Sequence, residues 1–267
     1  NNGGPGKSTS VLLRGTNADH VLVLVDGVKV GSATLGSVPF EDLPLEQVER
    51  IEVVRGPRGS LYGSEALGGV IQIFTRKGGG ELEPFAAFGG GSHETWTSSG
   101  GLRGGGENGW FSVSASRYDT EGFDAESGSE PDDDGYHRVA GQARAGYRFG
   151  DVAEIDLHAL RSASDNEYDG TFQNESENLQ QSWGGTLRVT PVAPWDLRLS
   201  GGRSRDENDN YLNGSFSSEF VTERDTLSLQ NDIAVGMNHL LTLGVDRQRD
   251  RVDGTTSYTV SSRDNRS

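Results

Sequence analysis

The sequence predicts part of a transmembrane antiparallel β-barrel, preceded by a small N-terminal α+β domain. Three observations lead to this fold class. Apolar and polar residues alternate along most of residues 83–250, which indicates half-buried strands. The connections between these strands are short at one end and long at the other, as in outer-membrane barrels. The first 80 residues instead contain compact apolar segments, so we expect two domains, residues 1–80 and 81–267.

The N-terminal domain is predicted from a hairpin, a short helix and two further strands. The runs "VLVLV" and "VKV" flank Asp26-Gly27, and an Asp-Gly pair between two β-rich runs is a strong hairpin signal. The segment "LPLEQVERI" indicates a short helix that leads into a strand, and "GGVIQIFTR" indicates another strand. Together these elements give a mixed α+β domain.

The second domain is predicted to contain about nine strands between residues 83 and 250. Their alternation separates an apolar face from a polar face, because successive side chains of a strand point to opposite sides. The apolar face is expected to meet lipid, with Val139, Ala143, Tyr147, Ile155 and Leu157 as examples. The polar face is expected to line the lumen, with Gln142, Arg144, Asp156 and His158 as examples.

The expected connections distinguish a barrel from a soluble β-sandwich. The short ones are residues 104–109, 149–152, 191–195 and 236–239. The long ones are residues 118–137, 164–181 and 204–225, which hold 19 of the 40 acidic residues. This asymmetry and the polar second face favour the barrel, because a sandwich needs a dry core. Four aromatic residues are expected near strand ends, as in a membrane girdle: Tyr147, Phe149, Trp183 and Trp195.

Composition and motifs exclude several other classes of protein. The net charge of −16 argues against a nucleic-acid partner, because phosphate binding needs clusters of Lys and Arg. The segment "GPGKST" lacks the first glycine of a phosphate-binding loop and precedes a strand instead of joining a strand to a helix. No arrangement of nucleophile, acid and base stands out, so we predict that the protein is not an enzyme.

One short segment, "GFDAESGSEPDDDGY" at residues 122–136, concentrates six carboxylates. Carboxylates this close repel one another, so either water solvates the segment or a cation lies among them. In an extended chain, Glu130, Asp132 and Asp134 point to one side. Ca²⁺ prefers six to eight oxygen ligands, which two acidic loops can supply. A solvated loop without metal is the alternative.

The N-terminal domain resembles the plug domain of TonB-dependent outer-membrane transporters. The similar stretches are "RGTNADHVLVLVDGVKV" and "VERIEVVRGPRGSLYGSEALGGVIQI", the second from Val48 to Ile73. In the second, Gly56, Gly63 and Gly68–Gly69 allow tight turns and close backbone approach. The resemblance implies a bacterial outer-membrane protein whose partners are a ligand, lipid and the TonB energy-coupling protein.

The same resemblance implies the C-terminal part of a plug and the N-terminal portion of a 22-stranded barrel. We expect the chain to be truncated at both ends. The first part of the plug, the signal peptide, the TonB-contacting segment and most barrel strands are then expected to lie outside it.

Within this family, the sequence is most similar to the cobalamin (corrinoid) transporters. That resemblance implies ligand contacts at plug positions Ser8, Ser10, Asn17, Leu35 and Gly36. It also implies a structural Ca²⁺ in the extracellular loops, held by Asp124, Glu130, Asp132, Asp134, Tyr168, Asp169 and Glu175, with Asn174 as the alternative to Glu175.

Three functions remain open from the sequence. The first is TonB-dependent uptake of cobalamin or another corrinoid, and the second is uptake of a ferric siderophore by the same fold. The third is a calcium-binding surface β domain without transport. The plug-like motif disfavours the third function, and the paired acidic loops favour the first over the second.

Overall fold

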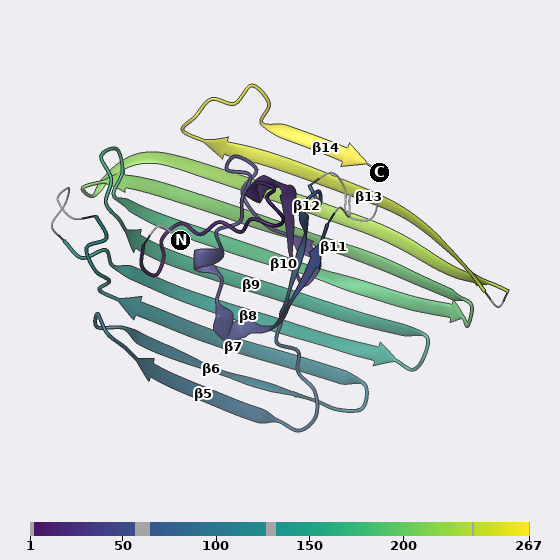
Figure 1. Ribbon diagram of the computed structural model, residues 1–267. Coiled ribbons are helices and arrows are strands. Elements are labelled where there is room, and N and C mark those ends of the chain that lie inside the picture. The colour runs from purple at the N-terminus through teal and green to yellow at the C-terminus, as the bar shows by residue number, and fades with distance from the viewer. Residues whose placement is uncertain (1–2, 57–64, 127–131, 237, 267) are drawn as a thin grey trace.

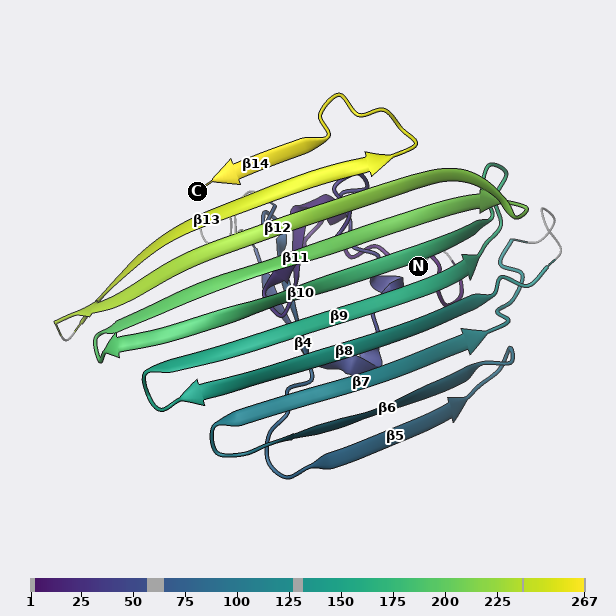
Figure 2. The same cartoon turned by 180° about the vertical axis from the view of Figure 1, so that it is seen from behind.

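The computed structural model describes residues 3–56, 65–126, 132–236 and 238–266, and within them a small mixed sheet lies against one face of a large antiparallel sheet (Figures 1 and 2). The small sheet has the strand order β2-β1-β4-β3. The large sheet has ten strands, each paired with its neighbours in the chain from β5 to β14. The fold class therefore agrees with the prediction, a small mixed domain followed by a large antiparallel sheet.

The small sheet and its 3-10 helices form the N-terminal domain. Its elements are η1 (Ala18–His20), β1 (Val21–Val25), β2 (Val28–Lys29), η2 (Phe40–Asp42), η3 (Leu45–Gln47), β3 (Val48–Arg55) and β4 (Gly69–Thr75). The predicted short helix is the single turn η3, because Pro44 precedes it and β3 begins directly after it. Among the described residues, no helix has the length and hydrophobicity needed to cross a membrane.

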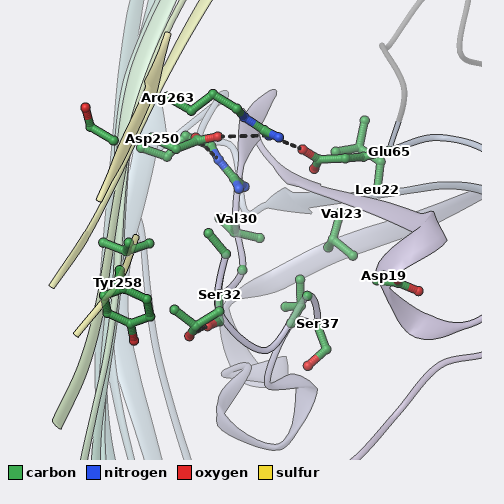
Figure 3. A pocket seen from close by; sticks show the side chains of 18 of the residues that line it. Asp19, Leu22, Val23, Val30, Ser32, Ser37, Glu65, Asp250, Tyr258 and Arg263 are labelled. Carbon is green, nitrogen blue, oxygen red and sulfur yellow. Dashed lines mark hydrogen bonds and ion pairs between the residues drawn. The ribbon is translucent and has the colours of Figure 1, made fainter. Parts of the chain in front are cut away.

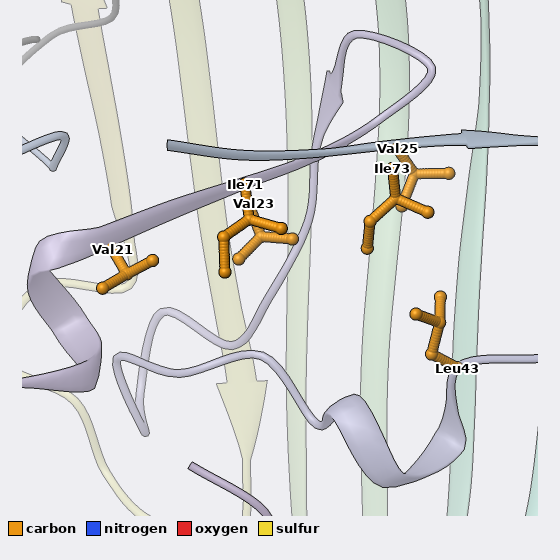
Figure 4. Close-up of a cluster of buried hydrophobic side chains, with 6 residues drawn as sticks. All are labelled: Val21, Val23, Val25, Leu43, Ile71 and Ile73. Carbon is orange, nitrogen blue, oxygen red and sulfur yellow. The ribbon is translucent and has the colours of Figure 1, made fainter. Parts of the chain in front are cut away.

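The predicted hairpin joins β1 to β2. Asp26 has φ 48° and Gly27 has φ 86°, and positive φ at both central residues marks the tight turn that suits antiparallel strands. All five residues of β1 are buried, because β1 pairs with β2 on one side and runs parallel to β4 on the other. One face of β1 and β4, together with Leu43 after η2, forms the cluster of Figure 4: Val21, Val23, Val25, Leu43, Ile71 and Ile73.

The large sheet confirms the nine predicted strands and adds a tenth. They are β5 (Glu83–Gly90), β6 (Trp96–Gly105), β7 (Gly109–Thr120), β8 (Tyr136–Phe149), β9 (Ala153–Glu167), β10 (Glu175–Val192), β11 (Trp195–Leu212), β12 (Ser215–Val235), β13 (His239–Gly254) and β14 (Ser262–Arg266). Nine of these strands, β5 to β13, cover Glu83–Gly254, close to the predicted extent. The short strand β14 follows them and pairs with β13.

The predicted connections are correct at one end of the sheet and partly wrong at the other. Residues 121–135 do connect β7 to β8, but β9 and β10 are joined by residues 168–174 alone. The predicted long loop 204–225 is wrong, because β11 and β12 continue through it to a two-residue turn at Asn213 and Gly214. Polar residues fill these strand ends on both faces, which is why the sequence resembled a loop there.

Three of the four aromatic residues expected near strand ends do lie there. Tyr147 and Phe149 lie at the end of β8, and Trp195 begins β11. Trp183 lies in the middle of β10, so its placement near a strand end was wrong. The cause is the predicted connection 164–181, which placed the start of β10 later than Glu175.

The predicted sidedness of the strands is confirmed. Val139 and Leu157 are 47% and 52% exposed on the face away from the small domain, whereas Gln142 and His158 are 3% and 8% exposed on the opposite face. Gln142 donates to the carbonyl of Arg76 in the N-terminal domain at 3.1 Å. The polar face of the large sheet is therefore the face that packs against the small domain.

Candidate functional site

The five predicted ligand-contacting residues lie on loops of the small domain. Ser8, Ser10, Asn17 and Leu35 are exposed, and Leu35 is an apolar side chain that is 67% exposed. Gly36 follows it with φ +67°, a left-handed conformation that favours glycine. Exposed hydroxyl, amide and apolar groups on neighbouring loops can contact a ligand that has both polar and apolar surfaces.

The structure brings these loops side by side. A Cβ added to Gly36 would lie 3.0 Å from the Cβ of Asp19, so the turn at Gly36 packs on the segment that begins at Asn17. Ser10, Ala18 and Ser37 line one small void of about 10 Å³ between the three loops. The backbone N–H of Ala33 donates to Thr222 Oγ1 of β12 at 3.0 Å, which fixes the loop that contains Leu35 and Gly36 to the large sheet.

A cavity of about 550 Å³ lies between these loops and strands β12 to β14 (Figure 3). Ser32 and Ser37 line it from the small domain, Arg263 lines it from β14, and Tyr258 lines it from the connection between β13 and β14. Arg263 forms ion pairs with Asp250 at 3.4 Å and with Glu65 at 3.6 Å, the contacts dashed in Figure 3. The cavity is therefore bordered by hydroxyl groups at one side and by paired charges at another.

The predicted metal-binding residues are gathered in part. Asp124 Oδ1 and Asp169 Oδ2 both accept the backbone N–H of Glu126, at 3.1 and 2.9 Å. Asp134 Oδ2 accepts the backbone N–H of Ala125, the residue before Glu126, at 3.1 Å. Carboxylates from the β7–β8 and β9–β10 loops thus converge on two adjacent amides. Burial is the largest cause that raises the pKa of Asp134. The negative charge of Asp132, which is exposed nearby, raises it further.

A lysine of the small domain lies among these acids. The Lys7 ammonium donates to the carbonyl of Asp134 at 3.2 Å and to Asn166 Oδ1 at 2.9 Å. Burial lowers the pKa of Lys7, and attraction by Asp134, Glu167 and Asp169 opposes that shift. The sequence analysis missed Lys7, and nothing in the sequence signals a contact between residues so far apart.

Three predicted metal-binding positions lie elsewhere. Tyr168 points its hydroxyl at Asn210 Oδ1 of β11, 3.4 Å away, and burial, followed by Glu175, raises its pKa to about 12. Glu175 Oε1 accepts the backbone N–H of Gly214 at 2.8 Å, so this carboxylate is directed at the β11–β12 turn. The alternative Asn174 contacts Asn213 of the same turn. Glu130 and Gly63 lie outside the described residues.

A different acidic group has the spacing that a metal ion needs. The oxygens of Glu207, Asp209 and Glu219 lie within 4.8 Å of one another, the only such group of three found among the described residues. They belong to β11 and β12, on the face away from the small domain. The sequence analysis missed them because their proximity depends on the strand register, in which Asp209 pairs with Glu219.

Comparison with known proteins identifies the small domain. Residues 1–70 match the family described as TonB-dependent Receptor Plug Domain. The whole chain is similar to the vitamin B12 transporter BtuB of Photobacterium profundum, with 35% identity over 98% of this chain and 44% of the relative. The chain belongs to the TonB-dependent receptor family. Its small domain is a plug, and its large sheet is part of an outer-membrane barrel wall.

Two further comparisons agree with this assignment. The BtuB of Vibrio vulnificus is 31% identical over 99% of this chain and 45% of the relative. The siderophore receptor PirA from Pseudomonas aeruginosa superposes with a TM-score of 0.70 and 23% identity over 95% of this chain and 44% of that one, which supports the fold. The chain thus spans less than half the length of these receptors. The family consists of bacterial outer-membrane receptors and transporters, not enzymes.

Proposed function

We propose that this receptor takes up cobalamin or a related corrinoid across the outer membrane, driven by TonB. The observation that carries the proposal is the similarity to vitamin B12 transporters over 98% of the chain. The site agrees with it, because a corrinoid has amide groups around its edge and apolar faces. Hydroxyl and amide side chains such as Ser10 and Asn17 suit the amides, and the exposed Leu35 suits a face.

Uptake of a ferric siderophore is the second candidate. The superposition with a siderophore receptor supports it only at the level of the fold, because fold does not fix the ligand. The acidic loops beside the plug disfavour it, since an anionic siderophore is expected to bind basic or aromatic groups. The third candidate, a surface domain without transport, does not explain a plug domain at residues 1–70.

We further propose that Ca²⁺ orders the acidic loops above the plug. The donor chemistry fits, because carboxylates of Asp124, Asp134 and Asp169 and the carbonyl of Asp134 are hard oxygen ligands of the kind Ca²⁺ prefers. Bound Ca²⁺ supplies positive charge that offsets repulsion between the two loops. Ordering the loops in advance lowers the entropic cost of ligand binding, so the affinity for a corrinoid is expected to rise with Ca²⁺.

Equilibrium binding to the full-length receptor tests the ligand. We expect cobalamin to bind and a panel of ferric siderophores not to bind. The Asn17→Ala variant should weaken cobalamin binding about three- to tenfold, the effect of one lost hydrogen bond. Asn108→Ala, in the β6–β7 turn at the other end of the sheet, is the matched control and should change nothing. Tight siderophore binding without cobalamin binding would favour the second candidate.

Calorimetric titration of the full-length receptor tests the calcium site. The double variant Asp132→Ala/Asp134→Ala should lose Ca²⁺ binding, because it removes two carboxylates of the predicted site. A control with the same change in charge is Glu107→Ala/Asp151→Ala, whose residues are exposed in turns at the opposite end. The calcium proposal is wrong if both double variants bind Ca²⁺ as the unmodified receptor does. If the Asp132→Ala/Asp134→Ala variant still binds Ca²⁺ because the ion sits at Glu207, Asp209 and Glu219, alanine substitutions at those three positions should remove the remaining binding.

A further inference from the structure

Lys7 is a buried cation that the plug inserts under the acidic loops. Lys7 is only 4% exposed, and a lysine this deeply buried usually has a charged partner. Its two hydrogen-bond acceptors come from different parts of the barrel, the carbonyl of Asp134 in the β7–β8 loop and the side chain of Asn166 near the end of β9. One ammonium therefore connects the plug, a loop and the barrel wall.

The chain around Lys7 is shaped to bring that ammonium close to the loop. Gly6 has φ +78°, and a Cβ at this position would overlap the Tyr136 ring at the start of β8. A Cβ added to Gly4 would come within 3.1 Å of the Phe123 ring in the loop. Two glycines thus allow the plug backbone to lie directly against the loop, so the contact does not depend on the long lysine side chain alone.

The charges around Lys7 are those that were expected to hold a metal ion. Asp134, Glu167 and Asp169 are the acids that attract the ammonium. Asp134 and Asp169 are predicted calcium ligands, and the same two loops place Asp124 beside Asp169 on one backbone amide. A positive charge here compensates the repulsion between loop carboxylates, as a bound cation does.

We propose that Lys7 is a built-in cation of the acidic loops, which holds residues 121–126, 132–135 and 168–174 against the plug without a divalent metal. Two consequences follow. The loops keep part of their order when Ca²⁺ is removed, in contrast to loops that depend on metal alone. The fixed positive charge also opposes any divalent cation that binds among the same carboxylates, so removal of the ammonium strengthens Ca²⁺ binding. The first consequence depends on neither the corrinoid nor the calcium proposal.

Hydrogen exchange of the full-length receptor in a calcium chelator, without ligand, tests the first consequence. The unmodified receptor should protect the amides of both loops. In Lys7→Met, which keeps most of the side-chain volume, exchange in these loops should be about tenfold faster or more, because local opening becomes easier. Lys7→Arg retains the charge and should retain most of the protection.

Lys29→Met is the matched control, because Lys29 is a second buried plug lysine that contacts the barrel. It donates to Gln248 and pairs with Glu65, far from the acidic loops in the strand order, so loop exchange should not change. If Lys7→Met and the unmodified receptor exchange equally in chelator, the inference is overturned. The same result follows if Lys29→Met accelerates exchange in the loops as much as Lys7→Met does, since the effect is then unspecific.

A calorimetric Ca²⁺ titration of the same variants tests the second consequence. Lys7→Met should bind Ca²⁺ about tenfold more tightly, because a fixed like charge has been removed from the site. Equal or weaker affinity in Lys7→Met contradicts the competition between lysine and metal. Failure of cobalamin to bind leaves both measurements unaffected, so the two proposals fail separately.

Discussion

Replacing Asp26 by alanine is expected to loosen the plug within the barrel by about 3–5 kcal/mol, the cost of breaking a buried ion pair. The Asp26 side chain is 2% exposed and accepts Arg144 Nη1 of β8 at 2.8 Å. It also accepts the hydroxyl and the backbone N–H of Thr75, at 2.5 and 3.1 Å. Alanine leaves these three donors without the carboxylate, while Arg144 keeps its ion pair with Asp156 and its hydrogen bond to the Thr75 carbonyl.

Hydrogen exchange of the β4 amides at increasing urea measures this effect in the full-length receptor. The opening free energy of Val70–Ile73 should fall in Asp26→Ala. In Asp26→Ala/Arg144→Met both charges are gone, so much of the loss should be recovered. Asp19→Ala is the control, because Asp19 is an exposed plug carboxylate and its removal should change stability by less than about 0.5 kcal/mol. A single variant as stable as the unmodified plug contradicts the prediction.

Replacing Leu157 by arginine is expected to destabilise the barrel by about 2–4 kcal/mol, the cost of a charged side chain at the lipid midplane. Leu157 is exposed on the face away from the plug, between Ala145 of β8 and Gly185 of β10. Its neighbours along the same face include Ile155 and Ala159, so no carboxylate of that face lies beside it in β9. An arginine there must reach through the apolar band to water.

Reversible unfolding of the full-length receptor in lipid vesicles measures this cost. Asp165→Arg is the matched control, since Asp165 lies on the same face of the same strand near its loop end. Its cost should be about 0–1 kcal/mol, as at the membrane interface. Equal destabilisation by both substitutions shows that the apolar face does not meet lipid. Stability of Leu157→Arg equal to that of the unmodified barrel leads to the same conclusion.

Local signals in the sequence were sufficient for much of the fold. Asp26-Gly27 identified the first hairpin because positive φ at both positions is a local property. The alternation around Val139 and Leu157 identified the face directed away from the plug, because alternation depends only on the period of a strand. The extent of β11 was not predictable in the same way. Its residues from Ser204 to Leu212 are mostly polar on both faces, since the strand continues past its apolar part.

The candidate site was less predictable because it depends on contacts between distant segments. Asp124 and Asp169 were predicted together and do converge on Glu126. Glu175 diverges from them because it begins β10 and binds the backbone of the neighbouring turn. Lys7 and Asn166 are 159 positions apart, and only the packing of the plug inside the wall brings them together.

The two-residue turn between β11 and β12 makes the mouth of the receptor uneven in height. The eighteen residues of β11 span roughly 60 Å along the strand. With a tilt near 45°, this corresponds to a height of roughly 40 Å above the start of the strand. The twelve residues of β7 reach only about 28 Å by the same reckoning, close to the apolar band of about 25 Å. The rim formed by the paired strands β11 and β12 is therefore higher than the end of β7. On the β7 side the connection that follows the strand builds the rim, whereas on the β11 side paired strands build it.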